Sequence, residues 1–165
     1  MNVKYKSFVS VFVNTLLIFF VAILRYSSLA TFKLGDAVPL VLLPVIIAIA
    51  MFFGDNASIL SALFAGVLMD SMSADSSWFN TIFFVITAAV CNFLCSRFLN
   101  KNLKAALSLT AIVSLIYFFL KYLIFFVFAG ITVNYDYFVL HLIPSVVYTA
   151  VFIIPFYFLE KKLAN

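Results

Sequence analysis

Residues 78–99 read WFNTIFFVITAAVCNFLCSRFL, and this stretch decides the class of fold. It contains one charged residue, Arg97, and is as long as the apolar run that a helix needs to cross roughly 30 Å of hydrocarbon. A run this long and this apolar is typical of a transmembrane helix rather than of a strand or a surface helix. We therefore expect residues 78–99 to form a membrane-spanning helix.

The composition of the whole chain points the same way. Of its 165 residues, 67% are hydrophobic and 10% are charged, whereas a water-soluble domain is about 45–50% apolar and about 25% charged. Such a chain has more apolar surface than it could bury if water surrounded it. The composition excludes a soluble globular protein, and the ten scattered basic residues do not form the patch that nucleic-acid binding requires.

Five further apolar runs accompany this one, separated by short polar breaks. The six predicted spans cover residues 7–24, 37–53, 57–70, 78–99, 105–129 and 137–159. The third is short, so it either extends into the polar segment that follows or lies shielded inside the bundle. No break is long enough for a soluble domain. We predict an all-α, polytopic integral membrane protein, a compact six-transmembrane-helix bundle that forms a single domain over residues 1–165.

The distribution of Lys and Arg predicts the orientation of this bundle. If the N-terminus is cytoplasmic, the outer side holds two basic residues, Arg25 and Lys33, and the inner side holds seven. The seven are Lys4, Lys6, Arg97, Lys101, Lys104, Lys161 and Lys162. Because cytoplasmic loops carry the excess of basic residues, we expect both termini to be cytoplasmic.

Within this set, Arg97, Lys101 and Lys104 form a basic cytoplasmic turn between the fourth and fifth spans. Two interpretations remain open for the turn. Its residues either only set the topology, or they also meet anionic lipids or a cytoplasmic partner.

Small residues recur along the third run. Gly54, Ser58, Ala62, Gly66 and Asp70 are spaced four apart and so lie on one helical face. Small side chains let another backbone approach closely, which is a main route of helix association in lipid. We expect this face to be buried, either against the chain's own helices or against a partner helix.

A polar cluster is predicted in the outer half of the bundle, made of Arg25, Asp70, Lys121 and His141. An ionised carboxylate at Asp70 needs water, a cation or hydrogen-bond donors in this setting, and Lys121 is the natural candidate partner. The cluster either ends and pairs helices, or it lines a polar pocket that opens outward and holds a ligand or a partner's polar group.

Other residues inside the runs are assigned structural roles. Asn14, Asn80 and Asn92 are expected to bond across to neighbouring helices, and Cys91 and Cys95 to be small core residues. Pro44, Pro144 and Pro155 are expected to kink or interrupt their runs. The chain lacks the spacing of a metal site, a catalytic triad or a phosphate-binding loop, so we expect no metal, no cofactor and no catalytic site.

The segment Ala65-Gly66-Val67-Leu68-Met69-Asp70, followed after a short polar loop by Trp78-Phe79-Asn80 and a long apolar helix, resembles the rod shape-determining protein MreD family. The proline-bearing run from Pro39 to Pro44 and the basic turn are similar to that family as well. The likeness in layout covers nearly the whole chain, and Asp70 and Asn80 match the family's motif.

The resemblance implies a non-enzymatic component of the bacterial inner membrane that belongs to the cell-elongation machinery. Proteins of this family associate with MreC, and through it with the MreB filament and the RodA/penicillin-binding-protein peptidoglycan synthase. The competing hypothesis is a solute-binding membrane subunit of an energy-coupling-factor vitamin transporter. In that protein Asp70, Lys121 and His141 would anchor a vitamin in an outward-facing pocket.

Overall fold

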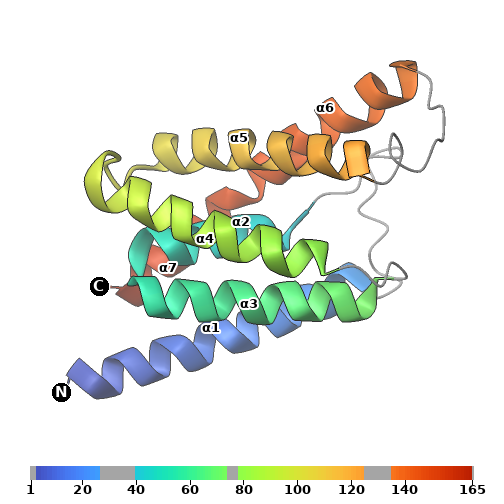
Figure 1. Cartoon of the computed structure of the whole chain (residues 1–165). Coiled ribbons are helices and arrows are strands. Elements are labelled where there is room, and N and C mark those ends of the chain that lie inside the picture. Colours follow the sequence, from blue (N-terminus) through green and yellow to red (C-terminus); the bar gives the residue numbers. More distant parts are fainter. Residues whose placement is uncertain (1–2, 27–39, 74–77, 125–134, 165) are drawn as a thin grey trace.

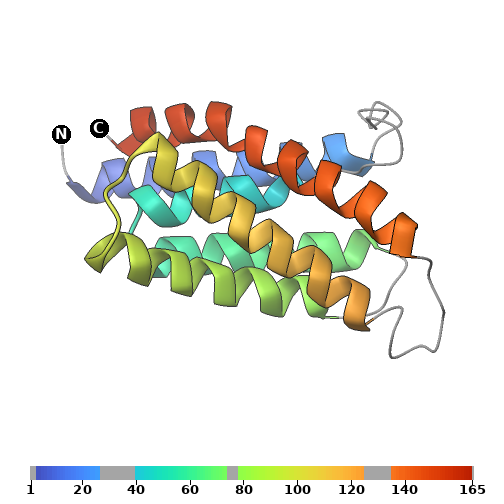
Figure 2. The same ribbon diagram turned by 90° about the horizontal axis from the view of Figure 1, so that it is seen from above.

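The computed structural model describes residues 3–26, 40–73, 78–124 and 135–164, and every regular element among them is a helix. The helices are α1 (Val3–Tyr26), α2 (Leu42–Phe52), α3 (Asp55–Met72), α4 (Phe79–Arg97), α5 (Leu103–Tyr122), α6 (Tyr135–Val151) and α7 (Ile153–Ala164). They lie alongside one another as an elongated bundle (Figures 1 and 2). The predicted helical class is confirmed, and the last predicted run is divided into α6 and α7.

Helix α2 is the centre of the bundle. Each residue from Leu42 to Met51 is buried, and α2 contacts all six other helices. A helix that is apolar on every side is stable only when it is surrounded by other apolar groups. With 11 residues, α2 is about 16 Å long, roughly half of the hydrocarbon thickness. The helical part of the second predicted run is therefore core rather than lipid-facing surface.

The prolines act differently from one another. Pro44 is expected to kink or interrupt its run. It lies in the first turn of α2, where its missing N–H would have had no partner within the helix, so it stands at the start of this helix rather than at a kink within it. Pro155 lies in the first turn of α7, so the carbonyl of Val151 has no N–H donor four residues on. The helix is interrupted at Phe152, between α6 and α7. Pro144 lies inside α6.

The helices around α2 expose large apolar side chains on their outward faces. Among the most exposed are Phe12, Phe20, Leu60, Ile82, Ile86, Ile112, Val147 and Phe158, each between 57% and 63% exposed. Three helical segments are long and apolar enough to cross a membrane: Phe79–Arg97, Leu103–Tyr122 and Leu142–Ala164. The last of these runs through the break between α6 and α7.

The two ends of the bundle are made of different segments. The start of α1, the turn between α4 and α5, and the end of α7 lie together at one end (Figures 1 and 2). These segments carry the seven basic residues that the sequence assigns to one side, so we call this the basic end. The end of α3, the start of α4 and the end of α5 lie at the opposite end (Figure 1).

Candidate functional site

The face of small residues on α3 is covered by the chain's own helix α4. Ser58, Ala62 and Gly66 are buried, whereas Gly54 precedes the helix and is exposed. A Cβ atom added at Gly66 would overlap the backbone Cα of Thr81 in α4. Further along, the Asn92 side-chain amide donates a hydrogen bond of 3.1 Å to the Ser58 hydroxyl. The small residues let α3 and α4 pack backbone against backbone.

Asp70, the last member of this face, accepts four hydrogen bonds from the start of α4. Its Oδ1 accepts the backbone N–H of Asn80 at 3.2 Å and the Asn80 side-chain amide at 2.7 Å. Its Oδ2 accepts the backbone N–H of Thr81 at 2.9 Å and the Thr81 hydroxyl at 2.6 Å. Both carboxylate oxygens are thus engaged by neutral donors on one neighbouring helix.

These bonds cap α4 from another helix. The first N–H groups of a helix have no intrahelical acceptor, and a Ser, Thr, Asp or Asn at the N-cap usually accepts one of them. Here the N-cap residue is Trp78, whose side chain makes no capping bond. Asp70 accepts the N–H groups of the second and third residues of α4 instead. Its negative charge also lies at the positive end of the α4 dipole, which is favourable.

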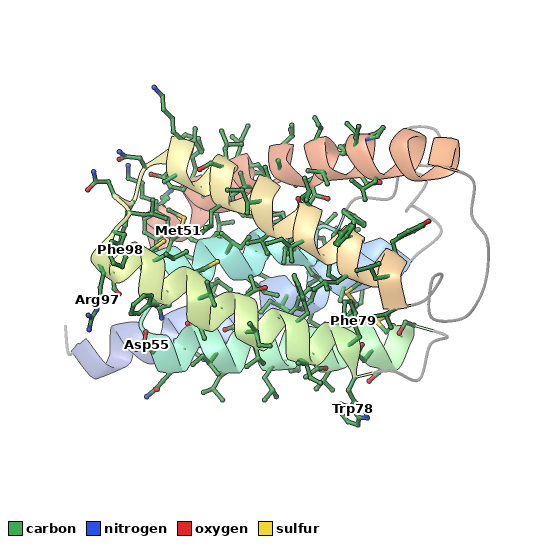
Figure 3. The ribbon with its side chains drawn as sticks, turned by 45° about the horizontal axis from the view of Figure 1, so that its top comes forward. Met51, Asp55, Trp78, Phe79, Arg97 and Phe98 are labelled. Carbon is green, nitrogen blue, oxygen red and sulfur yellow. The ribbon has the colours of Figure 1, made fainter. Side chains whose placement is uncertain are left out.

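Tyr117 extends the arrangement to α5. Its hydroxyl donates to the Asn80 Oδ1 at 2.7 Å, and its side chain is 1% exposed. The Tyr117 ring lies 5.1 to 5.6 Å from the rings of Phe79, Phe83 and Phe118. Figure 3 shows Phe79 turned into the bundle, whereas Trp78, one residue earlier, points away from it. The Asp70 network, meaning Asp70, Asn80, Thr81 and Tyr117, is therefore bordered by aromatic rings.

The other members of the predicted outer polar cluster are placed less completely. Lys121 is half-buried in the last turn of α5 and has an interaction of its own. The side chains of Arg25 and His141 lie outside the part of the chain whose side chains are described. The structure thus bonds Asp70 to Asn80 and Thr81, and Asn80 in turn to Tyr117.

Two members of the network were not anticipated from the sequence. Thr81 stands in the first turn of a helix, where a hydroxyl often bonds locally, and Tyr117 is a hydroxyl-bearing residue inside an apolar run. A buried tyrosine hydroxyl normally finds a hydrogen-bond partner, and that rule was the available signal. The cross-helix bonds expected of Asn80 and Asn92 are confirmed.

Among the residues that the structure describes, three buried side-chain oxygen atoms accept no hydrogen bond, one on Asn14 and two on Glu160. Asn14 was expected to bond across to another helix, but its Oδ1 accepts no hydrogen bond. Glu160 on α7 is fully buried, and neither carboxylate oxygen has a hydrogen-bond partner. Nothing in the spacing of the sequence marked Glu160, since it stands beside Lys161 and Lys162 at the end of the last run.

The basic turn is solvent-accessible. Arg97, Lys101 and Lys104 are all exposed, and the Tyr157 hydroxyl of α7 donates a hydrogen bond of 2.7 Å to the carbonyl of Lys101. Cys91 and Cys95 are free and buried, as expected. Among the described residues, no group of three or more His, Cys, Asp or Glu is placed to hold a metal ion.

Comparison with known proteins adds no relative: no family model, no curated protein and no solved structure matches this chain.

Proposed function

We propose that this chain is a multi-pass protein of the bacterial inner membrane, crossing it six times with both termini in the cytoplasm. In this proposal it is a non-enzymatic scaffold of the cell-elongation complex and associates with an MreC-like protein. Through that partner it would meet the RodA/penicillin-binding-protein synthase and MreB. Its contribution is the packing of helices within the bilayer.

The outward faces of the bundle support the membrane part of the proposal. Large aliphatic and aromatic side chains are exposed on helices all around α2, including Phe20 and Leu60 at 62% and 63%. An apolar surface of this extent is unfavourable in water and favourable in lipid. The segments that carry the seven basic residues lie at one end of the bundle (Figure 2), which suits a cytoplasmic face.

The observation that carries the scaffold proposal is the bonding of Asp70 to Asn80. These residues match the motif of the MreD family, and each belongs to a hydrogen-bonded network that links α3, α4 and α5. A motif residue used in this way shapes the bundle. The motif thus supports a protein that acts through the arrangement of its helices.

The same observation weighs against the solute-binding alternative. In a transporter subunit Asp70 would anchor a vitamin through its carboxylate. Here each oxygen of that carboxylate already accepts two hydrogen bonds from α4. A ligand would have to displace donors that also hold the start of α4.

Topology is tested with two single-cysteine variants at opposite ends of α4. Trp78→Cys and Asn100→Cys replace exposed residues in a background with Cys91→Ala and Cys95→Ala. We expect a membrane-impermeant maleimide to label Trp78→Cys in intact cells, and Asn100→Cys only after permeabilisation. The reverse pattern would refute cytoplasmic termini, and labelling of both positions in intact cells would refute the spanning of α4.

The scaffold role is tested in cells and by co-purification. We expect depletion of the chain to convert rods to round cells, and the tagged protein in mild detergent to retain an MreC-type membrane protein. Expression of the Gly54→Ala variant in the depleted cells is the control, because its added Cβ meets no neighbouring atom within 4 Å. This variant should restore rod shape. Rod-shaped growth after depletion, or a stoichiometric vitamin in the purified protein by mass spectrometry, would overturn the proposal.

A further inference from the structure

The basic end joins two segments that are far apart in the sequence. The Tyr157 hydroxyl donates to the Lys101 carbonyl at 2.7 Å, across 56 residues of chain. This bond fastens the last turns of α7 to the turn between α4 and α5. As a result, the exposed side chains of Lys101 and Lys161 belong to one surface.

Two ammonium groups on this surface lie over aromatic rings. Phe52, the last residue of α2, packs against Tyr157 with 5.3 Å between ring centroids. The Lys101 Nζ lies 6.0 Å from the Phe52 ring, and the Lys161 Nζ lies 5.8 Å from the Tyr157 ring. A cation over a ring face at such distances is attracted by the ring quadrupole. The two cations are therefore oriented by adjacent rings.

An exposed apolar surface begins at the end of α4, three residues before Lys101. Phe98, just after α4, is 73% exposed, and its ring lies 6.0 Å from that of Phe93. The Arg97 guanidinium lies 5.4 Å from the Phe93 ring, and Figure 3 shows Arg97 and Phe98 together at this end of α4. From Phe93 the exposed face continues along α4 through Val90, Ile86 and Ile82.

We infer that one surface of the basic end, made of Arg97, Phe98, Lys101 and Lys161, is a binding site for an anionic phospholipid. Lys101 and Lys161 hold the phosphate of the headgroup, and Arg97 stands at the level where headgroup meets acyl chain. Phe98 and the exposed face of α4 lie along the acyl chain. This inference rests on the proposal that the bundle lies in a bilayer and is independent of the scaffold role.

The combination of charge and apolar surface selects a lipid over an acidic protein segment. A soluble acidic peptide would pair with the lysines and leave Phe98 and the α4 face uncovered. A phospholipid matches both parts, because its phosphate meets the cations while its chain covers the adjoining apolar residues. Basic sites between helices on the cytoplasmic side are a common form of headgroup recognition.

The test is native mass spectrometry of the full chain in detergent with added phosphatidylglycerol or phosphatidylcholine. We expect the wild-type protein to bind phosphatidylglycerol in preference. The double variant Lys101→Gln/Lys161→Gln should lower that binding about tenfold. The matched control Lys104→Gln/Lys162→Gln removes the same charge from the same end and should lower it less than about twofold. An equal fall in both variants, or no preference in the wild type, would overturn the site.

A second measurement separates the lipid from other anions. Phe98→Ser keeps every charge but removes the apolar contact with the acyl chain, so it should weaken phosphatidylglycerol binding. Soluble glycerol phosphate, which has no acyl chain, should fail to compete for the wild-type site. Displacement of the lipid by glycerol phosphate or by a poly-glutamate peptide would refute the acyl-chain contact and favour a soluble partner. All variants should stay in phosphatidylcholine vesicles after carbonate washing, because insertion into the bilayer does not depend on the lipid site. Release of the protein would refute the membrane proposal rather than the lipid site.

Discussion

The two ends of the bundle are held by opposite means. At one end, a single carboxylate, Asp70, accepts four hydrogen bonds, and Tyr117 of a third helix bonds to the same Asn80. At the basic end, exposed cations surround one hydrogen bond from Tyr157. Asn80 and Tyr117 are buried and have lost their solvation, so the hydrogen bond between them favours one geometry. Exposed cations keep their water and remain available to a ligand.

The difference in burial sets the energies involved. A hydrogen bond to a charged group contributes about 1.5–3 kcal/mol, and loss of one partner leaves the buried Asn80 and the half-buried Asp70 or Thr81 unsatisfied. Exposed charge interactions contribute about 0–1 kcal/mol. We therefore expect substitutions at the Asp70 network to act on folding, and substitutions at the basic end to act on binding.

The largest effect is expected where α3 and α4 touch. A Gly66→Ala substitution places Cβ against the Thr81 backbone, which cannot swing aside as a flexible side chain would. The helices must separate, and Thr81 then loses its bonds to Asp70, for a cost of about 4 kcal/mol or more. Thermal unfolding in detergent, followed by circular dichroism, measures this loss. Gly54→Ala is the control, and an equal loss in both would show that backbone contact at Gly66 is not the cause.

The next effect concerns the cap itself. Asp70→Ala removes the acceptor of four hydrogen bonds and should cost about 3 kcal/mol of stability. Asp70→Asn keeps the shape but turns one oxygen into a donor, so its loss should be intermediate. The same unfolding measurement applies to both variants. If Asp70→Asn were as stable as the wild type, the charge and the second acceptor would have no role in capping α4.

The smallest effect compares the two tyrosine hydroxyls directly. Tyr117→Phe leaves the buried Asn80 carbonyl without its donor and should cost about 1 kcal/mol. Tyr157→Phe removes a bond to the exposed turn at Lys101, where water can replace it, and should cost less than about 0.5 kcal/mol. Equal losses in the two variants would contradict the difference in burial between the ends.

Some of this arrangement could be predicted from spacing alone. The four-residue repeat from Gly54 to Asp70 implied one buried face, because helical geometry places such residues in a row. The partner of that face could not be predicted, since any helix with small residues would fit. The sequence makes Lys121 the natural candidate partner of Asp70, because opposite charges attract. Backbone N–H groups at the start of a helix are equally good donors, but no residue type in the sequence marks them.

Helix α2 shows the same division. Its apolar run, residues 37–53, predicts a membrane-spanning helix that Pro44 kinks or interrupts. The start of the helix at Leu42 puts Pro44 in the first turn, where a proline is tolerated, and leaves 11 helical residues enclosed by all the other helices.

Composition and periodicity by themselves determined that this chain is helical, apolar on its outside and basic at one set of turns, because these properties depend only on which residues follow one another. Only the tertiary structure decided that Asp70 caps α4, that α2 is central, and that Lys101 and Lys161 share a surface. Those facts depend on which helices lie side by side. That choice is made by close packing and by the need to satisfy buried polar groups, both of which act between residues far apart in the chain.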